Sequence, residues 1–186
     1  IKLSQTAYTY NGKVQKPSVT VKDSTGKQLK SGADYTVNYP KGHKAVGRYG
    51  VQVKLKGKYK GSRTVYFTVK PKGTSISKVT GGKKKITVTW KKQTAQTTGY
   101  QIQYSTSSNF KNAKTVTVSK NSTTKKTITG LKNGKKYYVR VRTYKTVKTG
   151  RKSTKYYSSW SKSKTTGTAK KSAPKGNTVY VSPTGK

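Results

Sequence analysis

The sequence predicts an all-β protein built from two tandem antiparallel β-sandwich modules. Val, Ile, Tyr and Thr alternate with polar residues, and Gly and Asn interrupt these runs at short intervals. No segment shows a helical period of apolar residues. The hydrophobic content is only 28%, but fifteen Tyr and two Trp provide large apolar surfaces whose burial can offset the loss of chain entropy. Short strands and frequent turns of this kind are typical of sandwiches.

Three segments show the strand alternation most clearly: 49–55 ("YGVQVKL"), 84–90 ("KKITVTW") and 137–144 ("YYVRVRTY"). The residues predicted to point inward are Val51, Val53, Leu55, Ile86, Val88, Trp90, Tyr137, Val139 and Val141. In the third segment Tyr138, Arg140, Arg142 and Tyr144 are predicted to point outward. The turn signals that separate the strands are Asn11-Gly12, Gly26, Asn38-Tyr39-Pro40, Gly57 to Gly61 and Asn133-Gly134.

The domain organisation follows from two shifts in composition. Pro71 cannot donate to a strand ladder and Gly73 is conformationally permissive, so a linker is expected at residues 72–75. The predicted modules are therefore residues 1–71 and 76–170. Residues 171–186, "KSAPKGNTVYVSPTGK", are expected to form a C-terminal tail.

The charge balance is extreme. The chain carries 43 Lys and Arg against two acidic residues, a formal net charge of +41. Both acidic residues, Asp23 and Asp34, lie among turn signals, where a carboxylate can accept backbone N–H groups. Residues 1–71 hold 15 basic and 2 acidic residues, whereas residues 74–170 hold 24 basic residues and no acidic one. The second module is therefore the more extreme polycation.

Residues 76–168 resemble a fibronectin type III domain. The segment "ITVTW" is similar to its Trp-bearing strand B, "GYQIQYS" to its strand C, and "TITGLKNGKKYYVRVRTY" to its E–F turn and strand F. The resemblance implies that Leu131 is the turn leucine and that Tyr137 is the tyrosine-corner residue, whose hydroxyl bonds nearby backbone.

Residues 1–70 resemble bacterial Ig-like repeats through "YNGKVQKP", "GADYTVNY" and "GKYKG". Such repeats occur on secreted and wall-associated proteins of Gram-positive bacteria, especially Firmicutes, so the resemblance implies an extracellular, cell-surface or cell-wall location. The final "VYVSPTGK" is similar to the start of a terminal segment in those proteins. We therefore expect a parent protein that continues beyond Lys186.

Catalytic and metal-binding functions are not expected. General acid–base chemistry needs His, Asp or Glu, and the chain offers only His43, Asp23 and Asp34. The same shortage argues against a metal site, a cofactor site or an isopeptide bond that needs a buried acid. His43 is expected to be an exposed loop residue. No apolar stretch approaches the roughly 20 residues of a membrane-spanning helix.

Binding of polyanions is better supported, because far more Lys is present than solubility requires. The candidate residues form three clusters along the sequence. The first is in "VKLKGKYKGSR" and consists of Lys54, Lys56, Lys58, Lys60 and Arg63. The second is in "GGKKKITVTWKK" and consists of Lys83, Lys84, Lys85, Lys91 and Lys92. The third is in the F–G loop "KTVKTGRKSTK" and consists of Lys145, Lys148, Arg151, Lys152 and Lys155.

A further set of residues has two readings. Tyr138, Arg140, Arg142 and Tyr144, together with Trp160 of "SSWS", could stack on sugars or bases. Alternatively, they form a structural cation–π ladder like that of cytokine-receptor fibronectin domains, in which a Trp covers strand-F arginines.

The sequence thus predicts a monomeric, non-catalytic attachment module. Its expected partners are anionic polymers: teichoic acid, sulfated or sialylated glycans, and extracellular DNA. Lys outnumbers Arg by 38 to 5, which favours point-charge contacts without sequence selectivity. Two alternatives remain open: a passive spacer that presents another domain, and non-specific nucleic-acid binding.

Overall fold

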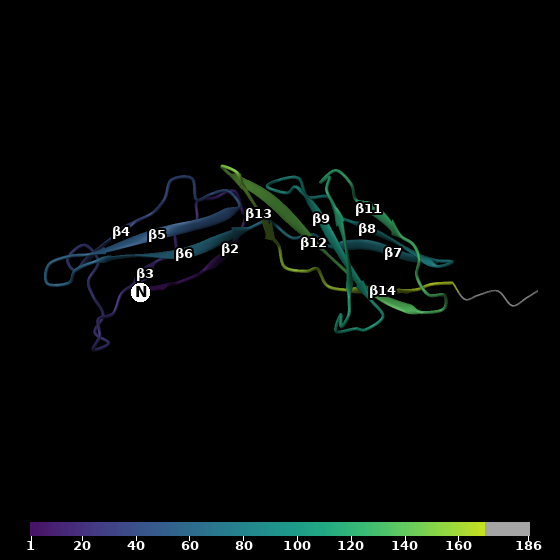
Figure 1. The fold of residues 1–186 in the computed structure, drawn as a ribbon, viewed down its shortest axis with the longest axis horizontal. Helices are drawn as coiled ribbons and strands as arrows, with labels where there is room; N and C mark the ends of the chain where they lie inside the picture. The colour runs from purple at the N-terminus through teal and green to yellow at the C-terminus, as the bar shows by residue number, and fades with distance from the viewer. Residues whose placement is uncertain (170–186) are drawn as a thin grey trace, which may run out of the picture.

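A computed structural model describes residues 1–169, all of whose regular elements are β-strands. Two units lie end to end in an elongated molecule (Figure 1). The predicted tail, residues 171–186, lies outside the described residues. Within residues 1–169 no helix is long and apolar enough to span a membrane.

The first unit consists of a four-stranded and a two-stranded sheet, in the orders β2-β6-β5-β4 and β1-β3. Its strands are β1 (Lys2–Leu3), β2 (Ala7–Thr9), β3 (Val19–Thr20), β4 (Tyr35–Asn38), β5 (Gly47–Leu55) and β6 (Ser62–Lys70). The apolar faces of the sheets meet in two clusters. Leu3, Val51, Phe67 and Val69 form one cluster, and Val21, Leu29, Tyr35 and Val53 form the other.

One strand pair departs from the antiparallel prediction. β2 pairs with β6 in parallel, with Ala7 opposite Thr68 and Thr9 opposite Lys70. These are the first and last strands of the four-stranded sheet along the chain, so the connection between them is long enough for a parallel crossover. The other pairs of named strands in both units are antiparallel.

The second unit is a sandwich of a three-stranded and a five-stranded sheet. The sheet orders are β11-β8-β7 and β10-β9-β12-β13, with β14 also pairing with β12. The strands are β7 (Ile76–Gly82), β8 (Lys85–Trp90), β9 (Gly99–Ser105), β10 (Lys114–Val118), β11 (Lys125–Ile128), β12 (Lys136–Thr149), β13 (Lys152–Tyr157) and β14 (Lys164–Gly167). Twelve buried residues from the two inner faces form its single core cluster, centred on the fully buried Trp90, Tyr100 and Ile102.

The predicted inward residues are in the interior. Eight of the nine are buried, and Leu55, at the end of β5, is half-buried. Tyr144 was predicted to point outward, yet it is only 3% exposed. Tyr144 does lie on the outward side of β12 by alternation, but the ring of Tyr157 on β13 stands 6.2 Å from it and Gly99 lies against its edge. Neighbouring side chains therefore cover it.

The turn predictions for the two aspartates are confirmed. The Asp23 carboxylate accepts hydrogen bonds from the Thr25 hydroxyl and from the backbone N–H groups of Thr25 and Lys27. The Asp34 carboxylate accepts the Lys30 N–H at 2.8 Å. Both carboxylates thus close turns, as the local chemistry predicted.

The prediction for His43 was wrong. Its ring is half-buried, and its Nε2 atom is covered without a hydrogen-bond partner. The ring packs among Tyr39, Tyr49 and Phe67, with centroids 6.1–6.3 Å away, and its Nδ1 bonds the Pro40 carbonyl. Apolar contacts with these rings, two from nearby residues and Phe67 from β6, hold it against the core.

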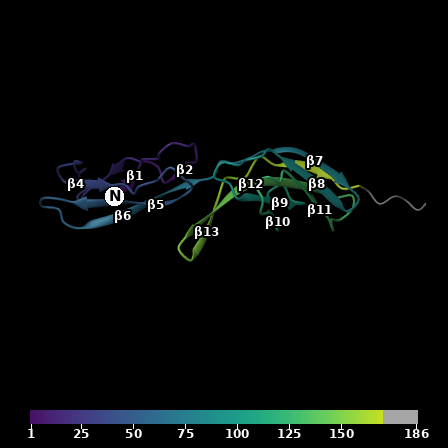
Figure 2. The ribbon, with the colours of Figure 1, turned by 90° about the horizontal axis from the view of Figure 1, so that it is seen from above.

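The two units meet at a polar junction. The Val46 N–H donates to Oε1 of Gln96 at 3.2 Å, and the Thr143 hydroxyl donates to the Lys72 carbonyl at 2.7 Å. The hairpin of β12 and β13 projects beside this junction, as Figures 1 and 2 both show. The junction therefore places a cationic hairpin next to the first unit.

Candidate functional site

The first predicted cluster surrounds the β5–β6 turn at the far tip of the first unit (Figure 1). Its five cationic side chains are all exposed, and several of them line a hollow of about 420 Å³ around Tyr59. The two aspartates lie at this same end. Asp23 accepts a hydrogen bond from the Tyr59 hydroxyl at 3.3 Å, and the Asp34 carbonyl accepts the Lys56 N–H at 2.7 Å. The positive potential of this tip is therefore partly offset.

The second predicted cluster is divided by the strand it contains. Lys83, Lys84 and Lys85 lie at the β7–β8 turn, whereas Lys91 and Lys92 follow the opposite end of β8. Six strand residues at about 3.3 Å each separate the two groups by roughly 20 Å. All five are exposed. The sequence places them in one run, but the structure brings only the first three together.

The turn that carries the first three lysines is fixed by the neighbouring loop. Lys84 has a left-handed backbone conformation, with φ of 50°. Its N–H donates to Oδ1 of Asn133 at 2.9 Å, and its carbonyl accepts the Leu131 N–H at 3.0 Å. These bonds hold a residue that would otherwise avoid this conformation. The lysines are thus presented on an ordered turn.

The third predicted cluster is spread over both faces of the β12–β13 hairpin. The register pairs Thr149 with Lys152 and Thr146 with Lys155. Because paired residues share a face and side chains alternate, Lys145 and Lys152 lie on one face while Lys148 and Lys155 lie on the other. Arg151 lies in the turn between them. Lys145 is half-buried and the other four residues are exposed.

The arginines of β12 form a stacked ladder with aromatic rings. In order along the stack, the members are Phe110, Arg140, Trp160, Arg142 and Tyr157. The guanidinium carbon of Arg140 lies 4.0 Å from the Phe110 centroid and 4.9 Å from that of Trp160. That of Arg142 lies 4.3 Å from Trp160 and 4.0 Å from Tyr157. Each cation therefore stands between two rings, a favourable cation–π arrangement.

Amide oxygens of β9 hold the two guanidinium groups in place. Nε of Arg140 donates to Oε1 of Gln103 at 2.7 Å. Nε and Nη2 of Arg142 donate to Oε1 of Gln101 at 3.0 and 2.7 Å. Burial lowers the pKa of both arginines below the usual value of a guanidinium group. The amides orient the charges but do not neutralise them, so the ladder stays cationic.

Two ladder members could not be read from the sequence motif. Tyr157 reaches the stack through the hairpin register, in which it pairs with Tyr144. Phe110 lies in an irregular turn with φ of 61°, where no periodicity applies. Of the predicted members, Tyr138 is half-buried, with the Lys136 Nζ 5.4 Å from its ring, and Tyr144 is buried beneath Lys155, whose Nζ is 5.3 Å from its ring. Tyr144 therefore has no exposed ring face on which a ligand could stack.

One family model matches a stretch that contains most of the second unit. Residues 69–159 match the model of the fibronectin type III domain. This match, over just under half of the chain, supports a fibronectin type III domain in the second unit. Such domains are typically extracellular and are generally binding or structural modules without catalytic activity. The comparison with curated proteins finds no match.

Three solved structures are similar to this chain. The crystal structure of the chicken CNTN1 FN1–FN3 domains has 23% identity and a TM-score of 0.46, with 68% of this chain and 44% of that chain covered. A computationally redesigned β-sandwich protein has 21% identity and a TM-score of 0.37, with coverage of 52% and 90%. The fn3 domain of the human collagen alpha-1(XX) chain has 18% identity and a TM-score of 0.34, with coverage of 54% and 82%.

Proposed function

We propose that this chain is a non-catalytic, extracellular attachment module that binds polyanions through its Lys-rich surfaces. The observation that carries the proposal is the absence of any Asp or Glu after Asp34 in the sequence. The exposed lysines of the second unit therefore have no carboxylate partner in their own unit. A polyanion would supply the missing counter-charge and release the small ions that otherwise surround the protein.

The residue types favour attachment without sequence recognition. Lys ammonium groups are compact point charges, and the three predicted clusters present them on strands and turns at separate places. The two arginines best suited to bidentate recognition are already engaged by Gln101 and Gln103. Teichoic acid and anionic host glycans fit this arrangement better than a nucleic acid read by its bases.

The proposal includes the origin of the chain and its boundaries. The motifs of the first unit support a bacterial Ig-like repeat at residues 1–71, followed by a linker at 72–75 and a fibronectin type III module at 76–170. A Gram-positive surface protein would present such modules next to its own anionic wall. Retention on that wall and adhesion to anionic host surfaces are the two proposed uses.

The experiment is retention on heparin and on purified Gram-positive walls across a salt series. We expect binding at about 0.15 M salt and release as salt rises, because exchange with small ions drives the interaction. Flow-through at about 0.15 M salt on both supports would contradict the proposal and favour a passive spacer. Competition among teichoic acid, heparan sulfate and DNA would rank the ligands.

A charge-matched pair of variants separates clustered from isolated lysines. Lys83→Gln with Lys85→Gln removes two charges from the β7–β8 turn, and Lys120→Gln with Lys162→Gln removes two exposed charges elsewhere. The first pair should elute from heparin at clearly lower salt than the second. Equal elution would show that only total charge matters.

A further inference from the structure

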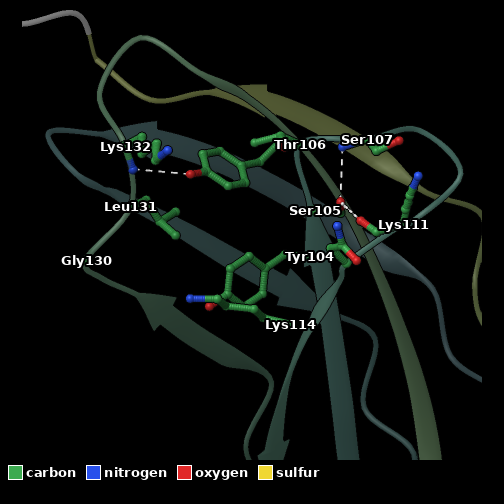
Figure 3. A pocket seen from close by; sticks show the side chains of 11 residues that line it. Tyr104, Ser105, Thr106, Ser107, Lys111, Lys114, Gly130, Leu131 and Lys132 are labelled. Atoms are coloured by element: carbon green, nitrogen blue, oxygen red, sulfur yellow. Dashed lines mark hydrogen bonds between the residues drawn. The ribbon is translucent and has the colours of Figure 1, made fainter.

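A cavity of about 380 Å³ opens on the second unit among the end of β9, the turn at 106–113 and the segment at 130–132 (Figure 3). This volume is within the range of small-molecule sites, about 300–1,000 Å³. Two stretches distant in sequence build it, residues 104–114 and residues 130–137, and none of its lining residues belongs to the clusters or the ladder. It is therefore a separate candidate site.

The floor of the cavity is aromatic and apolar. Leu131 and Tyr137 are buried, and Tyr104 is half-buried, with its ring centroid 6.3 Å from that of Tyr137. The Tyr137 hydroxyl accepts the Lys132 N–H at 3.2 Å, which ties the segment at 130–132 to β12. Packing and this bond fix the floor, so it can receive a flat apolar surface without reorganising.

Hydrogen bonds fix the wall formed by the turn at 106–113. The buried Ser105 hydroxyl accepts the Ser107 N–H at 3.0 Å and donates to the Lys111 carbonyl at 2.8 Å (Figure 3). The Asn109 side chain accepts the Lys111 N–H at 2.9 Å. The turn is thus held in the shape that closes one side of the cavity.

The rim of the cavity is cationic. Lys111 and Lys114, at the turn before β10 and the start of β10, line it together with Lys132 from the segment at 130–132, and all three are exposed. The only carboxylate side chains of the sequence, those of Asp23 and Asp34, belong to the first unit. Three ammonium groups therefore surround an aromatic floor with no acidic side chain of their own unit to neutralise them.

We propose that this cavity binds one carboxylate- or sulfate-bearing sugar unit of an acidic polysaccharide. A sugar ring offers an apolar face for Tyr104 and hydroxyls for the lysine and backbone groups, while its anionic substituent suits the rim. A polyol phosphate would satisfy the lysines but leave Tyr104 without a partner. The inference rests on the proposed polyanion binding and narrows it to acidic glycans at a defined pocket.

The test is titration of the 15N-labelled chain with tetrasaccharides from hyaluronan and heparin, followed by NMR. The neutral control is maltotetraose, and a glycerol-phosphate oligomer tests the phosphate source. We expect saturable one-to-one binding of the acidic sugars, with shifts concentrated at 104–114 and 130–132, including the Lys132 amide. Neither control ligand should produce that pattern. The same pattern with the glycerol-phosphate oligomer would overturn the assignment to a sugar.

Variants separate the pocket from general charge. Tyr104→Ala should weaken binding by about tenfold or more through lost stacking. Lys114→Gln should weaken it about two- to fivefold, whereas Lys126→Gln, an exposed charge on β11, should leave it unchanged. If Tyr104→Ala fails to fold, the comparison of Lys114→Gln with Lys126→Gln still tests the pocket. Equal weakening by both Lys variants, or scattered shifts, would overturn the inference.

The two proposals fail separately. Retention of the chain on heparin without any tetrasaccharide binding would overturn the pocket and leave the attachment function standing. Pocket-limited shifts with a chain that flows through heparin and wall columns at about 0.15 M salt would support the pocket and overturn the broader function.

Discussion

Single glycines decide how closely strands of the second unit approach. A Cβ atom added at Gly81 would lie 1.7 Å from the Gly167 carbonyl oxygen, and one added at Gly99 would lie 2.1 Å from that of Val118. Both obstacles are backbone atoms, which cannot rotate away. Neither glycine has a positive φ, so it is space rather than conformation that requires glycine here.

Gly81→Ala should therefore be strongly destabilising, by about 2 kcal/mol or more, because strands β7 and β14 must separate. Gly167→Ala is the matched control, since a Cβ there meets no atom within 4 Å. Urea unfolding followed by Trp fluorescence measures the difference. Similar midpoints for the two variants would contradict the close approach.

Local hydrogen bonds also lower the pKa of Asp23, one of the two acidic residues of the sequence. Asp23 receives the Thr25 hydroxyl and two backbone N–H groups, and these bonds, the hydroxyl first, hold its pKa below the usual 3.8. The folded state therefore binds its proton less readily than the unfolded state. The resulting stability is present above the unfolded pKa and is lost as pH falls through the folded value.

We expect the melting temperature of the first unit to fall between about pH 4 and pH 2 and to change little between pH 5 and pH 7. Asp23→Asn should lower stability at pH 7 and flatten this acid dependence. Thermal unfolding across the pH series gives both readouts. An acid dependence unchanged in Asp23→Asn would show that Asp23 is not responsible.

At the scale of elements, the ladder links β12 to three segments: the turn before β10, the edge strand β13 and the segment after β13. Of these three segments, only β13 pairs in the sheet as a strand. Phe110 comes from the turn before β10, the arginines from β12, Trp160 from the segment after β13, and Tyr157 from β13 itself. β13 pairs only with β12 and lies at the edge of its sheet. Stacking thus fastens the edge strand and the following segment to the centre of the sheet.

Trp160→Ala should destabilise the second unit by about 1–2 kcal/mol, because two cation–π contacts are lost. Lys162→Ala, two residues away and exposed, should have little effect. Urea unfolding monitored by the remaining Trp90 reports the change. An unaltered midpoint, together with loss of glycan binding, would instead favour a ligand-stacking role for Trp160.

Elements with a regular period were predictable from sequence, and sites formed by turns were not. Val51, Val53, Ile86 and Val88 are fully buried because alternation on a central strand fixes their side. Alternation did not reveal that Tyr157 covers Tyr144. The pocket was not predicted either. Residues 130–132, in the turn between β11 and β12, come next to residues 104–114 only in the folded structure.

The charge clusters show the same limit. Their lysines were recognisable from composition. Their closeness in the sequence did not show that the extended strand β8 separates Lys91 from Lys83 in space. The ladder arginines were recognisable from "SSWS" and their spacing, whereas Phe110 depends on a left-handed turn residue that no local rule predicted.

At the scale of the whole molecule, a net charge of +41 repels itself in the folded state. Added NaCl should therefore raise the melting temperature of each unit between 0.01 and 0.5 M, by about 4–8 °C for each kcal/mol of repulsion relieved. Sucrose at equal osmolality serves as the uncharged control. Salt-independent melting would mean that the cations are too far apart to destabilise the fold.

The first cluster, at the β5–β6 turn, and the lysines of the β7–β8 turn occupy opposite tips of an elongated molecule (Figures 1 and 2). On the proposed function, a polymer strand bound at one tip would leave the other tip free to bind a second strand. The proposed attachment function would then include cross-linking of separate polymer chains, which a compact cation with a single binding surface would not provide.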